Sequence, residues 1–317
     1  MSPGAEQQNL TLDLLWGVGA AVTTLLLLAA IAQLGVPGVL LNLFVAVPAA
    51  YVHMRFSTVA AVSAVGLVLA GEYLLAGPGG VAGYLLQFGI MSILLPLLMR
   101  RGLSWGRSAV LTIAVVSLCG LGLLASYANS AGSSVTEVVS GYAASEADQA
   151  MEIYKASDLT PEQLETLRES VDEMAGFIVY TYPGLAVSVV GLLALLMLGI
   201  LQVISKGRYE IPGPVFARWK SPELLVWPLI GAGFMFAMGE DAWRQIGANL
   251  LIVMLPIYFL QGLAIITYFF NKRRTPPLLR GLGYVLLTLF NPLPLIVAGI
   301  GVFDLWVDFR KPRIKET

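Results

Sequence analysis

The sequence predicts an all-α, polytopic membrane protein with about eight spanning helices and a C-terminal broken helical hairpin. Three observations lead to this fold class. The chain is 57% hydrophobic and 12% charged, and its mean hydropathy of +0.78 is too high for a soluble domain, which must cover its surface with polar atoms. Its apolar residues come in long runs, and 317 residues suit eight or nine spans of about 20 residues each. Its few charges are sorted into bands between those runs.

The apolar runs give the expected spans in chain order. The first five lie at about residues 12–34, 39–53, 58–75, 81–99 and 108–127, and the next three lie at about 177–203, 224–238 and 245–270. Turns rich in Gly and Pro at 35–38 and 77–80 connect the two spans within each of the first two hairpins. We therefore expect an N-terminal five-helix membrane part (1–127), an acidic external helical segment (128–176) and a C-terminal membrane part (177–317), joined in one integrated membrane domain.

The charges orient the chain. Sixteen of the 19 Lys and Arg residues fall in alternate loops or in the C-terminal tail, and ten of the 20 Asp and Glu residues fall between Asn129 and Glu173. Because cytoplasmic loops are enriched in Lys and Arg, we expect a bacterial cytoplasmic (inner) membrane protein with both termini in the cytoplasm and the acidic segment outside. The basic residues behind this prediction are Arg55, Arg100, Arg101, Arg107, Lys206, Arg208, Arg218, Lys220, Lys272, Arg273, Arg274, Arg280, Arg310, Lys311, Arg313 and Lys315.

The last apolar stretch, Leu282 to Val307, is broken at Asn291-Pro292-Leu293-Pro294. Each proline removes a backbone donor and disfavours helix before it. Either side of the break has about 12 to 14 apolar residues, fewer than the ~20 that a full crossing needs. We predict a hairpin that enters from the cytoplasm, turns near the break and returns. The alternative is a single kinked ninth span with the basic tail outside.

The acidic segment carries a helix start signal. Thr160 is a good N-cap, Pro161 suits the first helical position, and Gln163 can reach back as in a capping box. Apolar residues then recur at helical spacing toward the sixth span, and residues 135–154 are a weaker candidate for a second helix. The segment is either a solvated cap on the membrane domain or a lid or partner-docking surface.

Several chemistries lack the residues they need. His53 is the one histidine, so a multi-histidine metal or haem site is excluded, and we interpret His53 as an interfacial residue and not as the base of a Ser-His-Asp triad. No GxxxxGK[ST] loop occurs for ATP, and a net charge of −1 gives no basic field for nucleic acid. Cys119 is the single cysteine and is interpreted as a core residue. We expect no catalytic residues, no metal, no cofactor and no enzymatic activity.

Polar residues inside the apolar runs are the candidate ligand-binding groups. Burial in hydrocarbon is costly, so such side chains face the bundle interior or a cavity. For each amide, the alternative is a hydrogen bond between helices that only holds the bundle together. Glu72 could meet a ligand amine or Arg244, or could extend to the lipid headgroups. The candidates are Asn42, Glu72, Gln87, Asn249, Gln261, Asn291 and Asp304.

Two strings are distinctive. Residues 301–311 (GVFDLWVDFRK) place Asp304 and Asp308 four apart on one helix face, and residues 218–228 (RWKSPELLVWP) form a basic, aromatic re-entry into the membrane. With Asn291-Pro292 between them, these strings resemble the YybS-like family of uncharacterised bacterial inner-membrane proteins over most of the chain, from about Leu14 to Lys311.

That family is distantly similar to the S-components of energy-coupling factor transporters, which capture vitamins and work with a coupling protein and ATPases. This chain is longer, has more spans and carries the acidic segment. No vitamin-binding motif matches residue by residue, so the resemblance transfers no binding residue.

Two functions from different classes fit these observations. The first is a small-molecule-binding membrane subunit or transporter, which broken helices and buried amides favour. Its partners would be the lipid bilayer, a small-molecule substrate and separate coupling or ATPase subunits, and not a nucleic acid. The second is a non-transporting scaffold or assembly factor. A transporter should enclose a polar cavity lined by the candidate amides, whereas a scaffold should have those amides paired within the protein.

Overall fold

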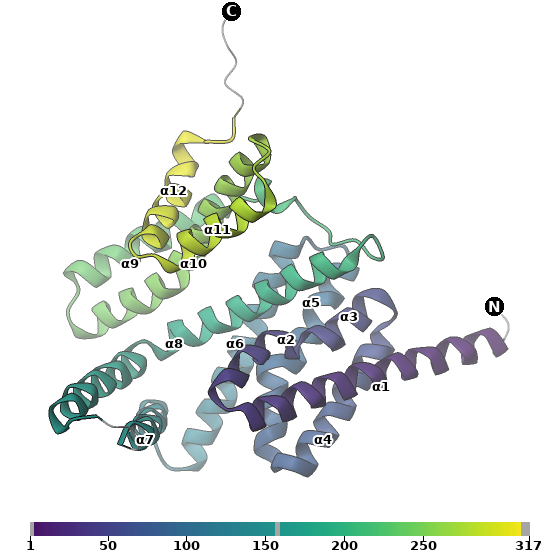
Figure 1. The fold of residues 1–317 in the computed structure, drawn as a ribbon, viewed down its shortest axis with the longest axis horizontal. Coiled ribbons are helices and arrows are strands. Elements are labelled where there is room, and N and C mark those ends of the chain that lie inside the picture. The colour runs from purple at the N-terminus through teal and green to yellow at the C-terminus, as the bar shows by residue number, and fades with distance from the viewer. Residues whose placement is uncertain (1–2, 156–158, 312–317) are drawn as a thin grey trace, which may run out of the picture. The chain divides into compact units, whose positions relative to one another are not determined.

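The computed structural model describes residues 3–155 and 159–311, and it is built from helices and short connections without strands over these residues (Figure 1). Arg313 and Lys315, which belong to the predicted basic tail, lie outside the described residues. The long helices are α1 (Pro3–Leu34), α3 (Val47–Arg55), α4 (Thr58–Tyr84), α5 (Ile90–Arg100), α6 (Trp105–Ser130), α7 (Val135–Lys155), α8 (Pro161–Ser205), α9 (Val226–Met238), α10 (Asp241–Lys272), α11 (Pro277–Leu289) and α12 (Leu293–Val307). Shorter turns of helix are η1 (Val36–Leu41), α2 (Asn42–Val45), η2 (Leu85–Gly89), η3 (Phe216–Arg218) and η4 (Glu223–Leu225).

The predicted fold class is confirmed: the chain is an all-α polytopic membrane protein. Among the described residues, six helices are long and apolar enough to cross a membrane, or seven if the bent pair α11–α12 counts as one span. Large apolar side chains on these helices are exposed, for example Leu118 at 68% and Leu26 at 66%. A soluble protein would pay heavily for such surfaces, so they indicate contact with the lipid bilayer.

The third and fourth predicted spans are connected differently in the structure. The third and fourth predicted spans lie in one helical run from Thr58 to Arg100, which is interrupted at Gly77, where φ is 67° and ψ is −158°, just before Pro78. The break is required because Pro78 lacks the amide hydrogen that a continuous helix would use. The seventh predicted span, at about 224–238, agrees with the apolar helix Glu223–Met238, which is shorter than the helices that are long enough to cross a membrane.

The chain divides into two compact units, each with its own packing. Unit 1 comprises residues 1–126 and 189–213, and unit 2 comprises residues 127–188 and 214–317. Unit 1 therefore holds α1 to α5, most of α6 and the C-terminal part of α8. Unit 2 holds α7, the N-terminal part of α8, and α9 to α12. The long helices α6 and α8 contribute to both units.

The core of unit 1 is made largely from alanine and other small residues. Ala20 and Ala21 of α1 and Ala60 and Ala64 of α4 are all buried, and α1 packs along α4 (Figure 1). A Cβ added to Gly17 would lie 2.0 Å from the hydroxyl oxygen of Ser63 on α4. In a lipid bilayer the hydrophobic effect does not drive helices together, so their association relies on van der Waals packing. Small side chains favour this packing because they let the helices approach closely.

The predicted histidine position needs correction. His53 is fully buried in unit 1, not at the lipid interface. Its Nε2 lies 3.1 Å from the hydroxyl oxygen of Thr58, and Arg100 donates a 2.8 Å hydrogen bond to its backbone carbonyl. The start of α4 and the end of α5 therefore cover the last turn of α3, so His53 is buried although it lies near the end of an apolar run. Cys119, interpreted as a core residue, is exposed instead.

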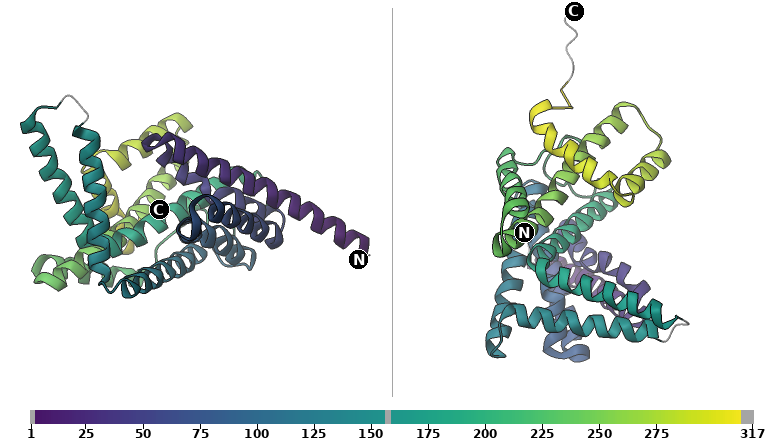
Figure 2. Two further views of the ribbon diagram at one scale, coloured as in Figure 1. Left: turned by 90° about the horizontal axis from the view of Figure 1, so that it is seen from below. Right: turned by 90° about the vertical axis from the view of Figure 1, so that its left-hand side faces the viewer.

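The acidic segment forms a hairpin from α7 and the start of α8 (Figure 2). The predicted capping box is present: the Thr160 amide donates to Gln163 Oε1 at 2.9 Å, and the Gln163 amide donates to Thr160 Oγ1 at 3.3 Å. Arg168 on α8 bonds Asp148 of α7 at 2.9 Å and Asp172 one turn further along α8 at 3.0 Å. Only the pair with Asp148 links the two helices, and because both ion pairs are exposed, each contributes little to stability.

A second capping box begins α7, and it gives a prediction on pH. The Ser134 amide donates to the Glu137 carboxylate at 2.6 Å, which lowers the pKa of Glu137 because the bond favours the charged form. A lowered folded-state pKa stabilises the helix above the unfolded-state pKa, and this stabilisation is lost as the pH falls. We expect the α7 N-terminus to fray below about pH 4. Hydrogen exchange of the first α7 amides checks this; a Glu137→Gln variant should show no such pH dependence, and equal fraying in both proteins would contradict it.

Candidate functional site

The candidate site of unit 2 lies where α10 and α12 approach each other most closely. A Cβ added to Gly301 would lie 2.0 Å from the carbonyl oxygen of Tyr258, and one added to Gly262 would lie 2.0 Å from the carbonyl oxygen of Val297. Glycine is therefore required at both positions, because any side chain would separate the helix backbones. This close approach brings the polar residues on facing turns of the two helices into contact.

Asp304 of α12 is the centre of a buried polar network. It is 1% exposed, and its carboxylate accepts from Arg310 at 2.5 Å, from Gln261 of α10 at 3.3 Å and from the backbone amide of Phe309 at 3.0 Å. Gln261, which is fully buried, in turn accepts from the backbone amide of Ser221 at 3.0 Å and from the Ser221 hydroxyl. The network thus joins α10, α12 and the loop before α9.

Arg310 reaches Asp304 because the chain turns back at the end of α12. Asp308 has φ 43° and ψ 71°, a left-handed conformation that ends the helix, and its amide still bonds the Asp304 carbonyl at 3.2 Å. Arg310 then lies almost buried, with a side chain 6% exposed. It also donates to the backbone carbonyls of Ala217 at 3.2 Å and Trp219 at 2.8 Å. One guanidinium therefore fixes the C-terminal end of α12 to the loop that precedes α9.

An exposed ion pair accompanies the buried one. Lys220 lies 3.0 Å from one carboxylate oxygen of Asp308, and Lys311 lies 3.6 Å from the other. The bond from Lys220 is the largest influence on Asp308 and lowers the pKa of its carboxyl. The two strings that the sequence singles out, 218–228 and 301–311, thus meet through both Arg310 and Asp308.

This contact bears on the C-terminal hairpin. The break at Asn291-Pro292 is present, the peptide between these residues is cis, and α11 and α12 are bent by 99° relative to each other. Arg310 contacts the loop before α9, which is part of the basic segment 206–220. A bend of 99° is compatible with both predicted alternatives, a broken span and a re-entrant stretch.

Tyr258 is a further buried side chain next to this network. Its side chain is fully buried, and its hydroxyl lies beside Ser221 without reaching hydrogen-bond geometry with any described residue. The Nε of Arg310 is also buried and has no hydrogen-bond partner among the described residues. Two donors of this site are therefore left for a water molecule or a ligand group.

Asn249 of α10 satisfies backbone groups of α8 at a proline. Pro183 removes one amide from the α8 ladder, and Asn249 bonds on both sides of it: its Oδ1 accepts from the Gly184 amide at 2.8 Å, and its Nδ2 donates to the Tyr180 carbonyl at 3.2 Å. A Cβ added to Gly184 would lie 2.6 Å from the Asn249 carbonyl oxygen. Asn249 therefore holds α8 and α10 together, as the interhelical alternative predicts.

The remaining predicted residues do not gather around Asp304. Asn42, Glu72 and Gln87 belong to unit 1, where Asn42 donates to the Val39 carbonyl at 3.1 Å within its own turn. Glu72 is half-buried beside the turn at Gly80, and Gln87 is exposed. Asn291 is exposed at the tip of the bent pair α11–α12. Only Gln261 and Asp304 of the predicted set contact each other in the interactions shown.

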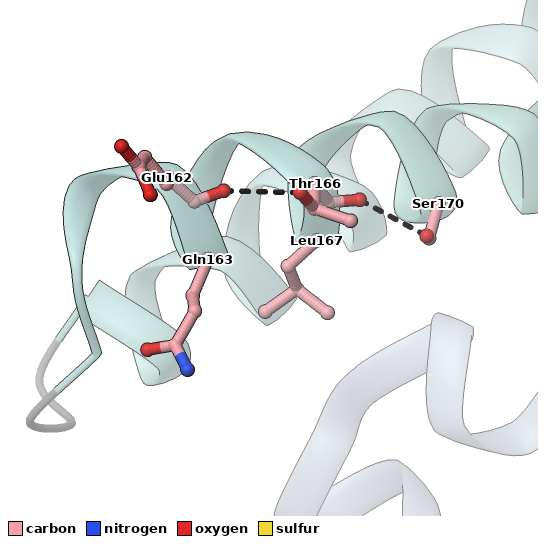
Figure 3. A pocket seen from close by; sticks show the side chains of 5 residues that line it. All are labelled: Glu162, Gln163, Thr166, Leu167 and Ser170. Atoms are coloured by element: carbon pink, nitrogen blue, oxygen red, sulfur yellow. Dashed lines mark hydrogen bonds between the residues drawn. The ribbon is translucent and has the colours of Figure 1, made fainter.

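Two surface pockets lined by described residues are open grooves. The first, of about 460 Å³, is lined by Glu162, Gln163, Thr166, Leu167 and Ser170, which all lie on the first turns of α8 (Figure 3). In that view Thr166 and Ser170 bond backward to the carbonyls of Glu162 and Thr166, so their hydroxyls serve the helix. The second groove, of about 420 Å³, is lined by the end of α10 and by Thr275. Neither groove contains a candidate residue.

A comparison with family models shows which family the chain belongs to. Residues 21–305 match the model of a family described as a predicted membrane protein, DUF2232. The chain belongs to this family. The match covers α12 through Asp304 and ends before Arg310. No curated protein and no solved structure matches this DUF2232 member.

Arg310 and Ser221 are the site residues that sequence reasoning missed. In the sequence, Arg310 belongs to the basic C-terminal tail because its charge follows an apolar run. The signal that could have identified it is its position six residues after an acid in an apolar helix, since an intramembrane carboxylate needs a cationic partner. Ser221 carries no comparable signal.

Proposed function

We propose that this DUF2232 member is a small-molecule-binding membrane subunit or transporter whose ligand site is centred on Asp304. The buried ion pair of Asp304 and Arg310 on a bent helix pair carries this proposal. A purely structural contact is served equally well by apolar side chains, because desolvating two charges costs as much as their attraction returns. Charged groups on broken helices inside membrane proteins are a recurring feature of substrate and ion pathways.

The chemistry of the site indicates what it would bind. Asp304 is held by Arg310 and Gln261, while the other partners of Arg310 among the described residues are backbone carbonyls. A ligand with a carboxylate or phosphate would compete for Arg310, and one with an ammonium group would compete for Asp304. The buried hydroxyl of Tyr258 and the Nε of Arg310 offer further donors. The proposed ligand is therefore a small charged molecule, and no enzymatic step, metal or cofactor is proposed.

The wider setting is part of the same proposal. The charge bias of the loops favours the inner membrane, with termini in the cytoplasm and the α7–α8 hairpin outside. The resemblance to energy-coupling factor S-components supports separate coupling or ATPase subunits as partners, because this chain lacks an ATP-binding loop of its own.

A scaffold or assembly factor is the second candidate, and one observation favours it. The amides of Asn249 and Gln261 are engaged by protein groups, as expected where they only hold helices together. In that case the exposed acidic hairpin of α7 and α8 would be the surface that meets a partner protein.

Native mass spectrometry of the protein released from gentle detergent separates the two candidates. The binding proposal predicts a reproducible small non-lipid adduct that an Asp304→Asn variant loses and a variant at an exposed acid, Asp241→Asn, retains. Circular dichroism is the control for the folding of both variants. Lipid adducts alone, or a stoichiometric protein bound through the α7–α8 hairpin, would contradict the binding proposal and support the scaffold.

A further inference from the structure

A second polar centre lies in unit 1, where two apolar helices end side by side. Arg55 is the last residue of α3, and α8 ends at Ser205. Lys206 and Gly207 then have φ of 43° and 75°, left-handed conformations that turn the chain back. The turn brings Arg208 to α3, and its amide bonds the Ser205 carbonyl at 2.8 Å.

The two arginines converge on one uncharged oxygen. Arg55 donates to the Tyr51 hydroxyl at 2.6 Å, and Arg208 donates to the same oxygen at 3.1 Å. Neither guanidinium has a carboxylate partner within ion-pair distance among the described residues. Two cations held close together repel each other unless an anion lies between them. The phenol oxygen alone provides a partial negative charge.

Aromatic side chains hold this arrangement in place. The Tyr209 ring packs edge-on against the Tyr51 ring with centroids 6.2 Å apart, and the Tyr209 hydroxyl donates to the Leu201 carbonyl at 2.7 Å. The Arg55 guanidinium carbon lies 5.0 Å from the centre of the Phe56 ring. The arginines are therefore positioned by their neighbours and still exposed, and each has several N–H donors to spare.

We propose that Arg55 and Arg208, with the Tyr51 hydroxyl between them, bind the phosphate of an anionic lipid headgroup. Both arginines lie at the ends of membrane-spanning helices, which is the level at which lipid phosphates occur. Guanidinium groups match phosphate oxygens through paired hydrogen bonds. A soluble phosphate would use the same donors, so the test separates the two sources. The site is independent of the proposed ligand site in unit 2.

The test uses the full chain in mixed micelles titrated with phosphatidylglycerol, with bound lipid counted by native mass spectrometry. A double variant, Arg55→Gln/Arg208→Gln, is compared with Arg101→Gln/Arg107→Gln, which removes the same charge from exposed positions in the neighbouring basic loop. The proposal predicts binding about tenfold weaker in the first variant and near wild type in the second. Millimolar inorganic phosphate should not displace the lipid.

Three results would overturn the proposal in different ways. Equal loss in both double variants would show a diffuse field instead of a site, and no loss in either would show that these arginines do not bind lipid. Displacement by inorganic phosphate would keep the anion site but assign it to a soluble ligand. If the double variant fails to fold, Arg208→Gln alone, which lies beyond the end of α8, should weaken binding several-fold against Arg101→Gln.

Discussion

Replacing Arg310 with alanine is expected to lower the free energy of unfolding by about 3–5 kcal/mol. The substitution leaves the Asp304 carboxylate buried with only Gln261 and the Phe309 amide as donors. It also removes the bonds to the Ala217 and Trp219 carbonyls that attach α12 to the loop before α9. Thermal and denaturant unfolding in detergent measure the effect.

The matched control for this substitution is Arg218→Ala. Arg218 lies in the segment before α9 that Arg310 contacts. Its side chain is exposed and makes no ion pair among the described residues. Its replacement should change the stability by less than about 0.5 kcal/mol, as is usual for surface positions. Equal effects of the two substitutions would mean that net charge, and not the buried contact, determines the stability of unit 2.

Replacing Gly301 with alanine is expected to cost about 1–3 kcal/mol, because the new methyl group would overlap the Tyr258 carbonyl on α10. Gly299, two residues earlier on α12, has nothing within 4 Å of its Cβ position. Gly299→Ala should therefore leave stability unchanged or raise it by up to about 1 kcal/mol, since alanine favours helix. Unfolding in detergent measures the stability of both variants. If both substitutions change the free energy of unfolding in the same direction and by similar amounts, the close α10–α12 contact is contradicted.

The fold class could be predicted from the sequence because its signals are local. Long apolar runs, Gly-Pro turns and the Thr160 capping box each depend on a few neighbouring residues, and the break at Asn291-Pro292 follows from two prolines. The predicted turn at Gly77-Pro78 is present as a non-helical break, although the helix resumes directly after it. The predicted seventh span, at about 224–238, coincides with the apolar helix Glu223–Met238.

The candidate site was predictable only in part. Asp304 and Gln261 stand out because a polar group in an apolar helix is costly. Their contact depends on Gly262 and Gly301, which face each other although they are far apart in the sequence, and no local pattern contains that pairing. His53 was misplaced for the same reason, since Arg100 and Thr58 cover it from other segments.

The central claim is that Asp304 and Arg310 act as one buried unit that joins α12 to the rest of unit 2. A double-mutant cycle of Asp304→Ala and Arg310→Ala, measured by unfolding in detergent, tests it most directly. The double variant is expected to be less destabilised than the sum of the single variants by at least about 2 kcal/mol, because each single variant leaves the other charge buried without its partner. Additive effects would contradict the claim and show that the two residues act separately.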